Sequence, residues 1–93
     1  MWVRRRKYYP FLVYYMSIVT DEQFNQFIDD SRWLHRNYNE LIIEFNLEYI
    51  AIRNHMVVAH GKEMNELERE LKQSNIDRLD VVVEFIRDKR NEV

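Results

Sequence analysis

Residues 48–61, which read EYIAIRNHMVVAHG, decide the fold. Over residues 48–53 isoleucines alternate with tyrosine, alanine and arginine, the two-residue period of a β-strand, and a second apolar run follows at 56–59. Asn54 and His55 separate the two runs, and Asn tolerates the positive φ that two-residue hairpin turns require. The sequence therefore predicts a β-hairpin that turns at these two residues.

Upstream of the hairpin, apolar residues recur at steps of three and four from Phe24 to Phe45, the spacing of one helix face. Residues 20–23, which read TDEQ, have the form of a capping box, with a hydroxyl N-cap and Gln at the third helical position. A helix over 21–45 is the prediction. Residues 29–31 (DDS) offer a second N-cap, so two helices with a bend between them are an alternative.

Downstream, Gly61 ends the second strand, and residues 62–74 have the apolar spacing of a short amphipathic helix. Residues 81–86 (VVVEFI) give the strongest strand signal of the chain. The connection between the second and third strands is long enough for a right-handed crossover, which predicts that these strands are parallel. The expected fold class is α+β: one helix or two, a hairpin, a helix and a third strand, in a small three-stranded mixed sheet with helices on one face.

Because side chains alternate between the faces of a sheet, the position of the turn also predicts which residues face together. On one face the expected pairs are Ile52 with Val57 and Ile50 with Ala59, and on the other they are Ala51 with Val58, Arg53 with Met56 and Tyr49 with His60. We expect the helices to cover the first face and to leave the second half apolar and open to a partner. The residues expected at this interface are Tyr49, Ala51, Met56, Val58, Val82, Glu84 and Ile86.

The length of 93 residues fits one domain, and 46% hydrophobic with 32% charged residues is typical of a chain that folds. The sequence has no cysteine, which excludes disulfides, thiol catalysis and cysteine-containing metal sites. No apolar run approaches the roughly 20 residues of a membrane-spanning helix. We expect no integral membrane association and a cytoplasmic location.

The chain divides by composition into three segments: a basic and aromatic extension at 1–15, a single domain at 16–87, and a charged tail at 88–93. The extension has four basic and no acidic residues, whereas residues 16–93 have ten basic residues against 16 acidic ones, a net charge of −6. One interpretation is that translation naturally starts at Met16. The alternatives are an extra strand, a membrane-surface anchor of basic and aromatic groups, or a signal peptide, for which no cleavage site is evident.

Few residues suggest a chemical site. His35, His55 and His60 lack the spacing of metal ligands, and we predict no metal, cofactor or catalytic residue. The acidic pairs fit a solvated helix surface, and the aromatic residues of the first helix, Trp33 among them, fit a core. Gly61 and Lys62 precede a helix N-terminus and could contact an anion, although a glycine that simply turns the chain is the plainer explanation.

Several short motifs together resemble a family of short archaeal and bacterial domains of unknown function. Its pattern is a helix with Trp followed four residues later by Asn, a hairpin of the VAI…VVAHGK type, a short helix and a terminal EFI strand. The matching residues are Trp33 and Asn37, 49–52 (YIAI), 57–62 (VVAHGK) and 84–86 (EFI), within a resemblance that covers about 20–87. The resemblance implies the fold and brings no established activity.

These observations favour a non-catalytic interaction module that self-associates through a sheet face or edge, as a homodimer, or that binds another protein. An enzyme is not expected. The alternative is an antitoxin-like or regulatory DNA-associated protein. Because the rest of the domain is acidic, nucleic acid would have to be contacted through Arg4, Arg5, Arg6 and Lys7.

Overall fold

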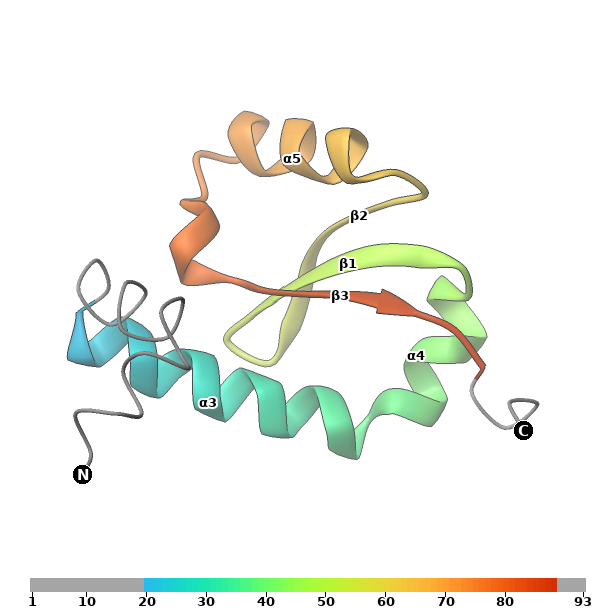
Figure 1. The fold of residues 1–93 in the computed structure, drawn as a ribbon, viewed down its shortest axis with the longest axis horizontal. Coiled ribbons are helices and arrows are strands. Elements are labelled where there is room, and N and C mark those ends of the chain that lie inside the picture. The colour runs from blue at the N-terminus through green and yellow to red at the C-terminus, as the bar shows by residue number, and fades with distance from the viewer. Residues whose placement is uncertain (1–19, 89–93) are drawn as a thin grey trace, which may run out of the picture.

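The computed structural model describes residues 20–88, and the predictions made for 1–15, for the tail beyond residue 88 and for a start at Met16 lie outside them (Figure 1). Helices and strands follow one another in the predicted order. They are α3 (Asp21–Arg36), α4 (Tyr38–Phe45), β1 (Glu48–Arg53), β2 (Met56–Gly61), α5 (Met64–Gln73), the 3-10 turn η1 (Arg78–Asp80) and β3 (Val82–Ile86).

The capping box predicted at the start of the first helix is confirmed. The Thr20 hydroxyl accepts a hydrogen bond from the Gln23 amide at 3.1 Å, and the Gln23 side chain accepts one from the Thr20 amide at 3.0 Å. The alternative of two helices in place of one over 21–45 is what the structure has, but the helices separate at Asn37. The side-chain amide of Asn37 donates a hydrogen bond to the Trp33 carbonyl at 2.8 Å. The bend does not fall at 29–31, because Asp30 is buried and bonds to the hairpin instead.

The hairpin turn is confirmed, because Asn54 and His55 both have positive φ values, 52° and 60°, as a type I′ turn requires. The two pairs nearest the turn, Arg53 with Met56 and Ile52 with Val57, are also confirmed. Beyond them a β-bulge shifts the register. The remaining predicted pairs are therefore wrong by one residue: Ala51 lies opposite Ala59, Ile50 opposite His60, and Tyr49 opposite Gly61.

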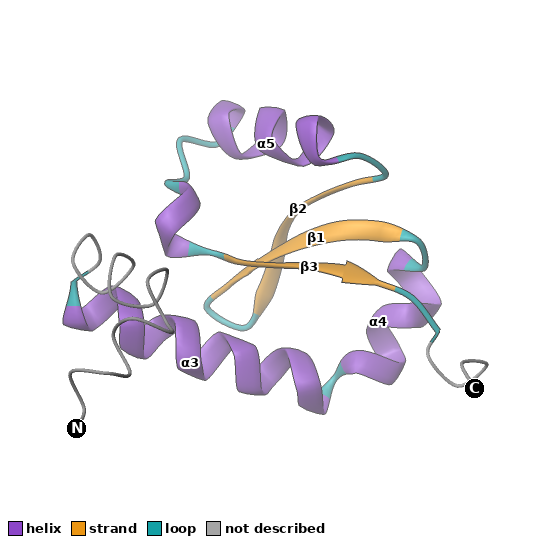
Figure 2. Cartoon of the chain, viewed as in Figure 1, coloured by secondary structure: helices purple, strands orange, loops and turns teal. Residues whose placement is uncertain are grey.

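The α+β class and the three strands are confirmed, but the sheet is antiparallel and not mixed (Figure 2). The strand order is β2-β1-β3, and both neighbouring pairs are antiparallel. The connection through α5 does make β2 and β3 run in the same direction. They never pair, because β1 lies between them.

Helices cover both faces of the sheet, so the prediction of helices on one face is wrong (Figure 1). Helices α3 and α4 pack on one face, and α5 packs on the other, because the crossover from β2 to β3 passes over β1 on that side. The first core contains Leu34, Leu41, Phe45, Ile50, Ile52, Val82 and Ile86. The second contains Ala51, Ala59, Leu67, Leu71 and Val81.

Candidate functional site

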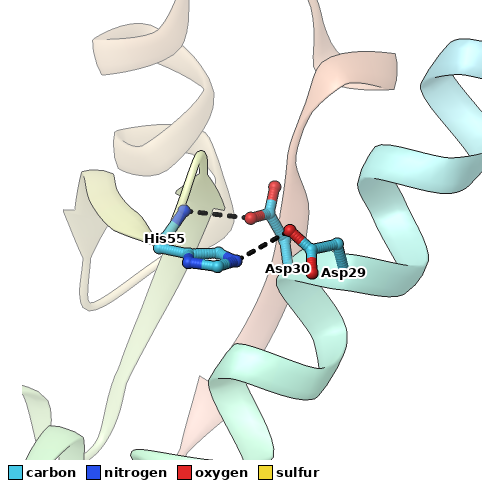
Figure 3. A group of neighbouring side chains, drawn as sticks. All are labelled: Asp29, Asp30 and His55. Carbon is cyan, nitrogen blue, oxygen red and sulfur yellow. Dashed lines mark hydrogen bonds and ion pairs between the residues drawn. The ribbon is translucent and has the colours of Figure 1, made fainter.

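A buried carboxylate on α3 holds the tip of the hairpin (Figure 3). Asp30 has no exposed surface, and its two oxygens accept hydrogen bonds from the backbone amides of Asn54 at 3.1 Å and His55 at 3.0 Å. The side chain of Gln26, one helical turn earlier, donates a third hydrogen bond at 3.0 Å. Three donors around one buried carboxylate offset the cost of removing it from water.

The neighbouring side chains extend this contact to the surface. His55 Nε2 lies 2.8 Å from a carboxylate oxygen of Asp29, and the His55 ring stacks on Trp33 with their centroids 6.0 Å apart and their planes at 11°. The side chains of His55 and Asp29 both remain substantially exposed to solvent. Trp33 is half-buried and packs against the first core, as expected of a core aromatic residue.

Asp29, Asp30 and His55 bring potential metal-ligand atoms within 4.8 Å of one another. However, Asp30 already accepts three hydrogen bonds, and the nearest His55 nitrogen faces Asp29. A cation would have to displace contacts that hold the turn. The cluster is therefore explained by its structural role in joining α3 to the hairpin.

The expected anion contact at Gly61 and Lys62 would meet the carboxylates of Glu63 and Glu66 at the start of α5. The Glu66 side chain accepts a hydrogen bond from the Glu63 amide at 3.0 Å, and the backbone carbonyl of Glu63 accepts the amides of Glu66 and Leu67. A carboxylate thus already pairs with a backbone amide that an anion would use. Gly61 is required for another reason: a Cβ there would lie 2.8 Å from the Cβ of Glu66, so α5 could not approach the strand as closely.

The residues predicted as one interface lie on both faces of the sheet. Ala51, Val82 and Ile86 are buried inside the domain, the first under α5 and the other two under α3 and α4. The bare face expected from the sequence does not exist among the described residues. Of the remaining four, Tyr49, Val58 and Glu84 are half-buried, and Met56 is 59% exposed.

What stays open in the described part of the chain is the pair of sheet edges. The edge at β2 is interrupted by the β-bulge, and the backbone amide of His60 is already bonded to a carboxylate oxygen of Glu70 at 3.1 Å. The edge at β3 pairs with β1 in continuous register on its inner side. No described strand pairs with its outer side.

His60 lies at the β2 edge among carboxylates. Its Nδ1 is 2.8 Å from a Glu48 oxygen, and this hydrogen bond raises the pKa of His60 above its usual value. The negative charges of Glu70 and Glu44 act in the same direction, while partial burial acts against them. The ring also contacts Phe45, with centroids 5.3 Å apart. Carboxylates from β1, α5 and α4 thus act together on the His60 ring.

Beside this edge runs a groove between the helices and β2, here called the α4–β2 groove. Its volume is about 400 Å3. Its apolar lining combines aromatic and aliphatic side chains, and two carboxylates belong to its helical side. The lining residues are Trp33, Asn37, Glu40, Leu41, Glu44, Phe45, Met56 and Val57.

A protein family model, the family of unknown function DUF5678, matches residues 40–89. The chain belongs to the DUF5678 family. The match runs from α4 through the hairpin and α5 to β3, and it begins after Trp33 and Asn37. Searches of the curated proteins and of the solved structures gave no match. Among residues 20–88 of this DUF5678 protein, no helix has the length and apolar character needed to cross a membrane.

The hydrogen bonding of Asp30 to the hairpin turn of this DUF5678 protein was not predicted, although the sequence contained a signal for it. Asp30 lies four residues before Leu34 on the apolar stripe of α3, where a charged residue needs a buried partner. The groove could not be found in the same way. Its residues come from α3, α4 and β2, and only the packing of these elements brings them together.

Proposed function

We propose that this protein is a non-catalytic interaction module that self-associates through the outer edge of β3. The observation that carries the proposal is the strand order β2-β1-β3, which leaves β3 at the end of the sheet with no described strand on its outer side. An unpaired edge presents a row of backbone donors and acceptors that can pair with another strand.

The two edges of the sheet differ in a way that favours β3. Natural proteins protect edge strands with bulges and charged side chains, and β2 has both, because Glu70 bonds to the His60 amide beside the bulge. Strand β3 has no bulge in its pairing with β1, and its single charged residue is Glu84. Just beyond β3, the Tyr38 hydroxyl bonds to the backbone amide and carbonyl of Arg87, so a partner strand would pair along Val82–Ile86 itself.

The side chains of β3 also suit a second strand. Phe85 is half-buried and contacts the Tyr49 ring at a centroid distance of 4.9 Å, and Val83 is half-buried on the same face, beside α5. A further strand paired with β3 would bury more of both side chains. A second copy of the chain can pair antiparallel about a two-fold axis, so that the same residues serve on each side.

The hydrogen bonds of the polar clusters support a non-catalytic role. Asp30, the only buried charged side chain among the described residues, holds the hairpin turn. Residues 20–88 contain 15 acidic and eight basic residues, a balance that disfavours contact with a phosphate backbone. This charge does not favour the DNA-associated alternative.

Substitution of one valine on each edge tests the proposal. Val83 and Val58 are both half-buried on the α5 face, one on β3 and one on β2. Lysine at an edge blocks strand pairing while its stem can still cover apolar surface. We expect the full chain and V58K to sediment as dimers at tens of micromolar, and V83K to sediment as a monomer with the same circular dichroism spectrum.

Two results would contradict self-association through β3. The first is a full chain that is monomeric at that concentration in analytical ultracentrifugation, which would assign the β3 edge to another segment or another protein. The second is a dimer that V58K disrupts and V83K leaves intact, which would place the contact at the β2 edge.

A further inference from the structure

The α4–β2 groove combines an apolar lining with two carboxylates. Its apolar lining includes Trp33 and Phe45, and its helical side has Glu40 and Glu44, which lie one helical turn apart. The β2 side adds Met56, which is 59% exposed, a large value for an apolar side chain. A ligand that fits this groove needs aromatic or aliphatic surface together with positive charge.

The carboxylates of the groove lie outside the ion pairs formed among the described residues. The recorded ion pairs of residues 20–88 join His55 to Asp29 and His60 to Glu48, and neither includes Glu40 or Glu44. Glu44 is close enough to the His60 ring to act on its charge, so the acidic surface continues from the groove along the β2 edge. Unpaired carboxylates of this density attract cationic groups.

We propose that the α4–β2 groove binds the basic and aromatic segment of its own chain, residues 4–9 (RRRKYY). Charge complementarity supports this occupant, since residues 1–15 have four basic and no acidic groups, while residues 20–88 have seven more acidic than basic ones. Arginine forms paired hydrogen bonds with carboxylates, and it is attracted to the face of tryptophan more than to other rings. Tyr8 and Tyr9 supply the aromatic surface.

The length of the chain permits this contact. Trp33 and Asn37 of the groove lie at the C-terminal end of α3, and Thr20 caps the N-terminal end of the same helix. Sixteen residues give α3 a length of about 24 Å. The thirteen Cα–Cα steps from Lys7 to Thr20 span up to about 43 Å in an extended chain. The basic segment therefore reaches the groove without strain.

Paramagnetic relaxation in the full chain tests the proposal directly. The protein has no cysteine, so Val3→Cys carries a single nitroxide label beside the basic residues without replacing any residue of the segment 4–9. We expect strong broadening of the backbone amide signals of Glu44 and Val57, and little broadening of Glu68 on α5. Raising the salt from about 0.01 M to about 1 M shortens the Debye length from about 30 Å to about 3 Å and should reduce this difference.

Two matched double variants separate the groove from general attraction to an acidic domain. E40Q/E44Q removes two charges from the groove, and E22Q/E68Q removes two exposed charges from elsewhere on the surface. The broadening of Val57 should be lost in the first variant and kept in the second. Equal broadening of Val57 in both variants, or its absence in the parent chain, would overturn the proposal.

A mixed sample identifies which chain supplies the segment. The sample mixes a nitrogen-15 chain that lacks the nitroxide with a natural-abundance chain that carries it. In this mixture, broadening of the Glu44 amide signal reports only contacts between molecules. We expect none in the V83K background, where the β3 edge is blocked. Broadening of Glu44 in the mixed sample as strong as in the fully labelled one would overturn the contact within one chain. Loss of the groove contact leaves sedimentation as an independent measure of self-association at β3, so the two proposals fail separately.

Discussion

At the scale of single residues, Asp30 and Asp29 are adjacent in sequence and opposite in role. Asp30 is buried and accepts both turn amides, whereas Asp29 is exposed and contacts only the His55 ring. Asp30→Ala should lower the free energy of unfolding by at least about 1.5–3 kcal/mol, the contribution of one hydrogen bond to a charged group. Urea denaturation measures the loss.

Asp29→Ala is the matched control for this prediction. Its pair with His55 is exposed to solvent, and such pairs contribute only about 0–1 kcal/mol. Equal losses for the two substitutions would show that the buried hydrogen bonds of Asp30 do not hold the hairpin to α3.

His60 makes the stability of the domain depend on pH. Its hydrogen bond to Glu48 raises its pKa in the folded protein, so protonation favours the folded state. This stabilisation is fully present below the pKa of an unfolded histidine, about 6.5, and is lost as the pH rises through the higher folded value. His60→Gln should therefore lower Tm more at about pH 5.5 than at about pH 8.5.

In a nuclear magnetic resonance titration, the His60 ring should titrate at a higher pH than the ordinary histidine value of about 6.5. An His60→Gln variant whose loss of Tm is independent of pH would contradict the linkage to Glu48.

At the scale of elements, the close approach of α5 to β2 depends on Gly61. A Cβ at this position would lie 2.8 Å from the Glu66 Cβ and 3.1 Å from the Leu67 amide nitrogen, both within α5. Gly61→Ala should destabilise the domain by about 1–3 kcal/mol, the usual cost of overpacking. Thermal unfolding followed by circular dichroism checks this value.

The neighbouring Lys62 is exposed, and Lys62→Ala should change stability by no more than about 0.5 kcal/mol. A larger loss for Lys62→Ala than for Gly61→Ala would indicate that charge, and not space, governs this junction. The comparison also separates the packing role of the glycine from the anion contact expected at the start.

At the scale of the whole molecule, the crossover through α5 decides which surfaces are available. It places one helical layer on each face of the sheet, so that neither face is left bare among the described residues. The self-association proposed at β3 would have a thermodynamic consequence, because a dimer is stabilised by mass action. Tm of the parent chain should rise with protein concentration, and Tm of V83K should not.

Local patterns in the sequence were enough to predict the elements. The capping box at Thr20, the hairpin turn at Asn54 and His55, the amphipathic helix that became α5 and the final strand are all present. Each depends on a few neighbouring residues, such as a hydroxyl beside a free amide or an Asn that accepts positive φ. The sequence also indicated an uncharacterised family, which the DUF5678 match supports.

The tertiary structure decided what these elements enclose. The bulge shifted the pairing of Ala51 by one residue, and the antiparallel order β2-β1-β3 placed Val82 and Ile86 under α3 and α4. Such features depend on contacts between residues far apart in the chain, which periodicity does not encode. For the same reason the partners of Asp30 and the α4–β2 groove emerged only from packing, although the place of Asp30 on the apolar stripe of α3 was a signal in the sequence.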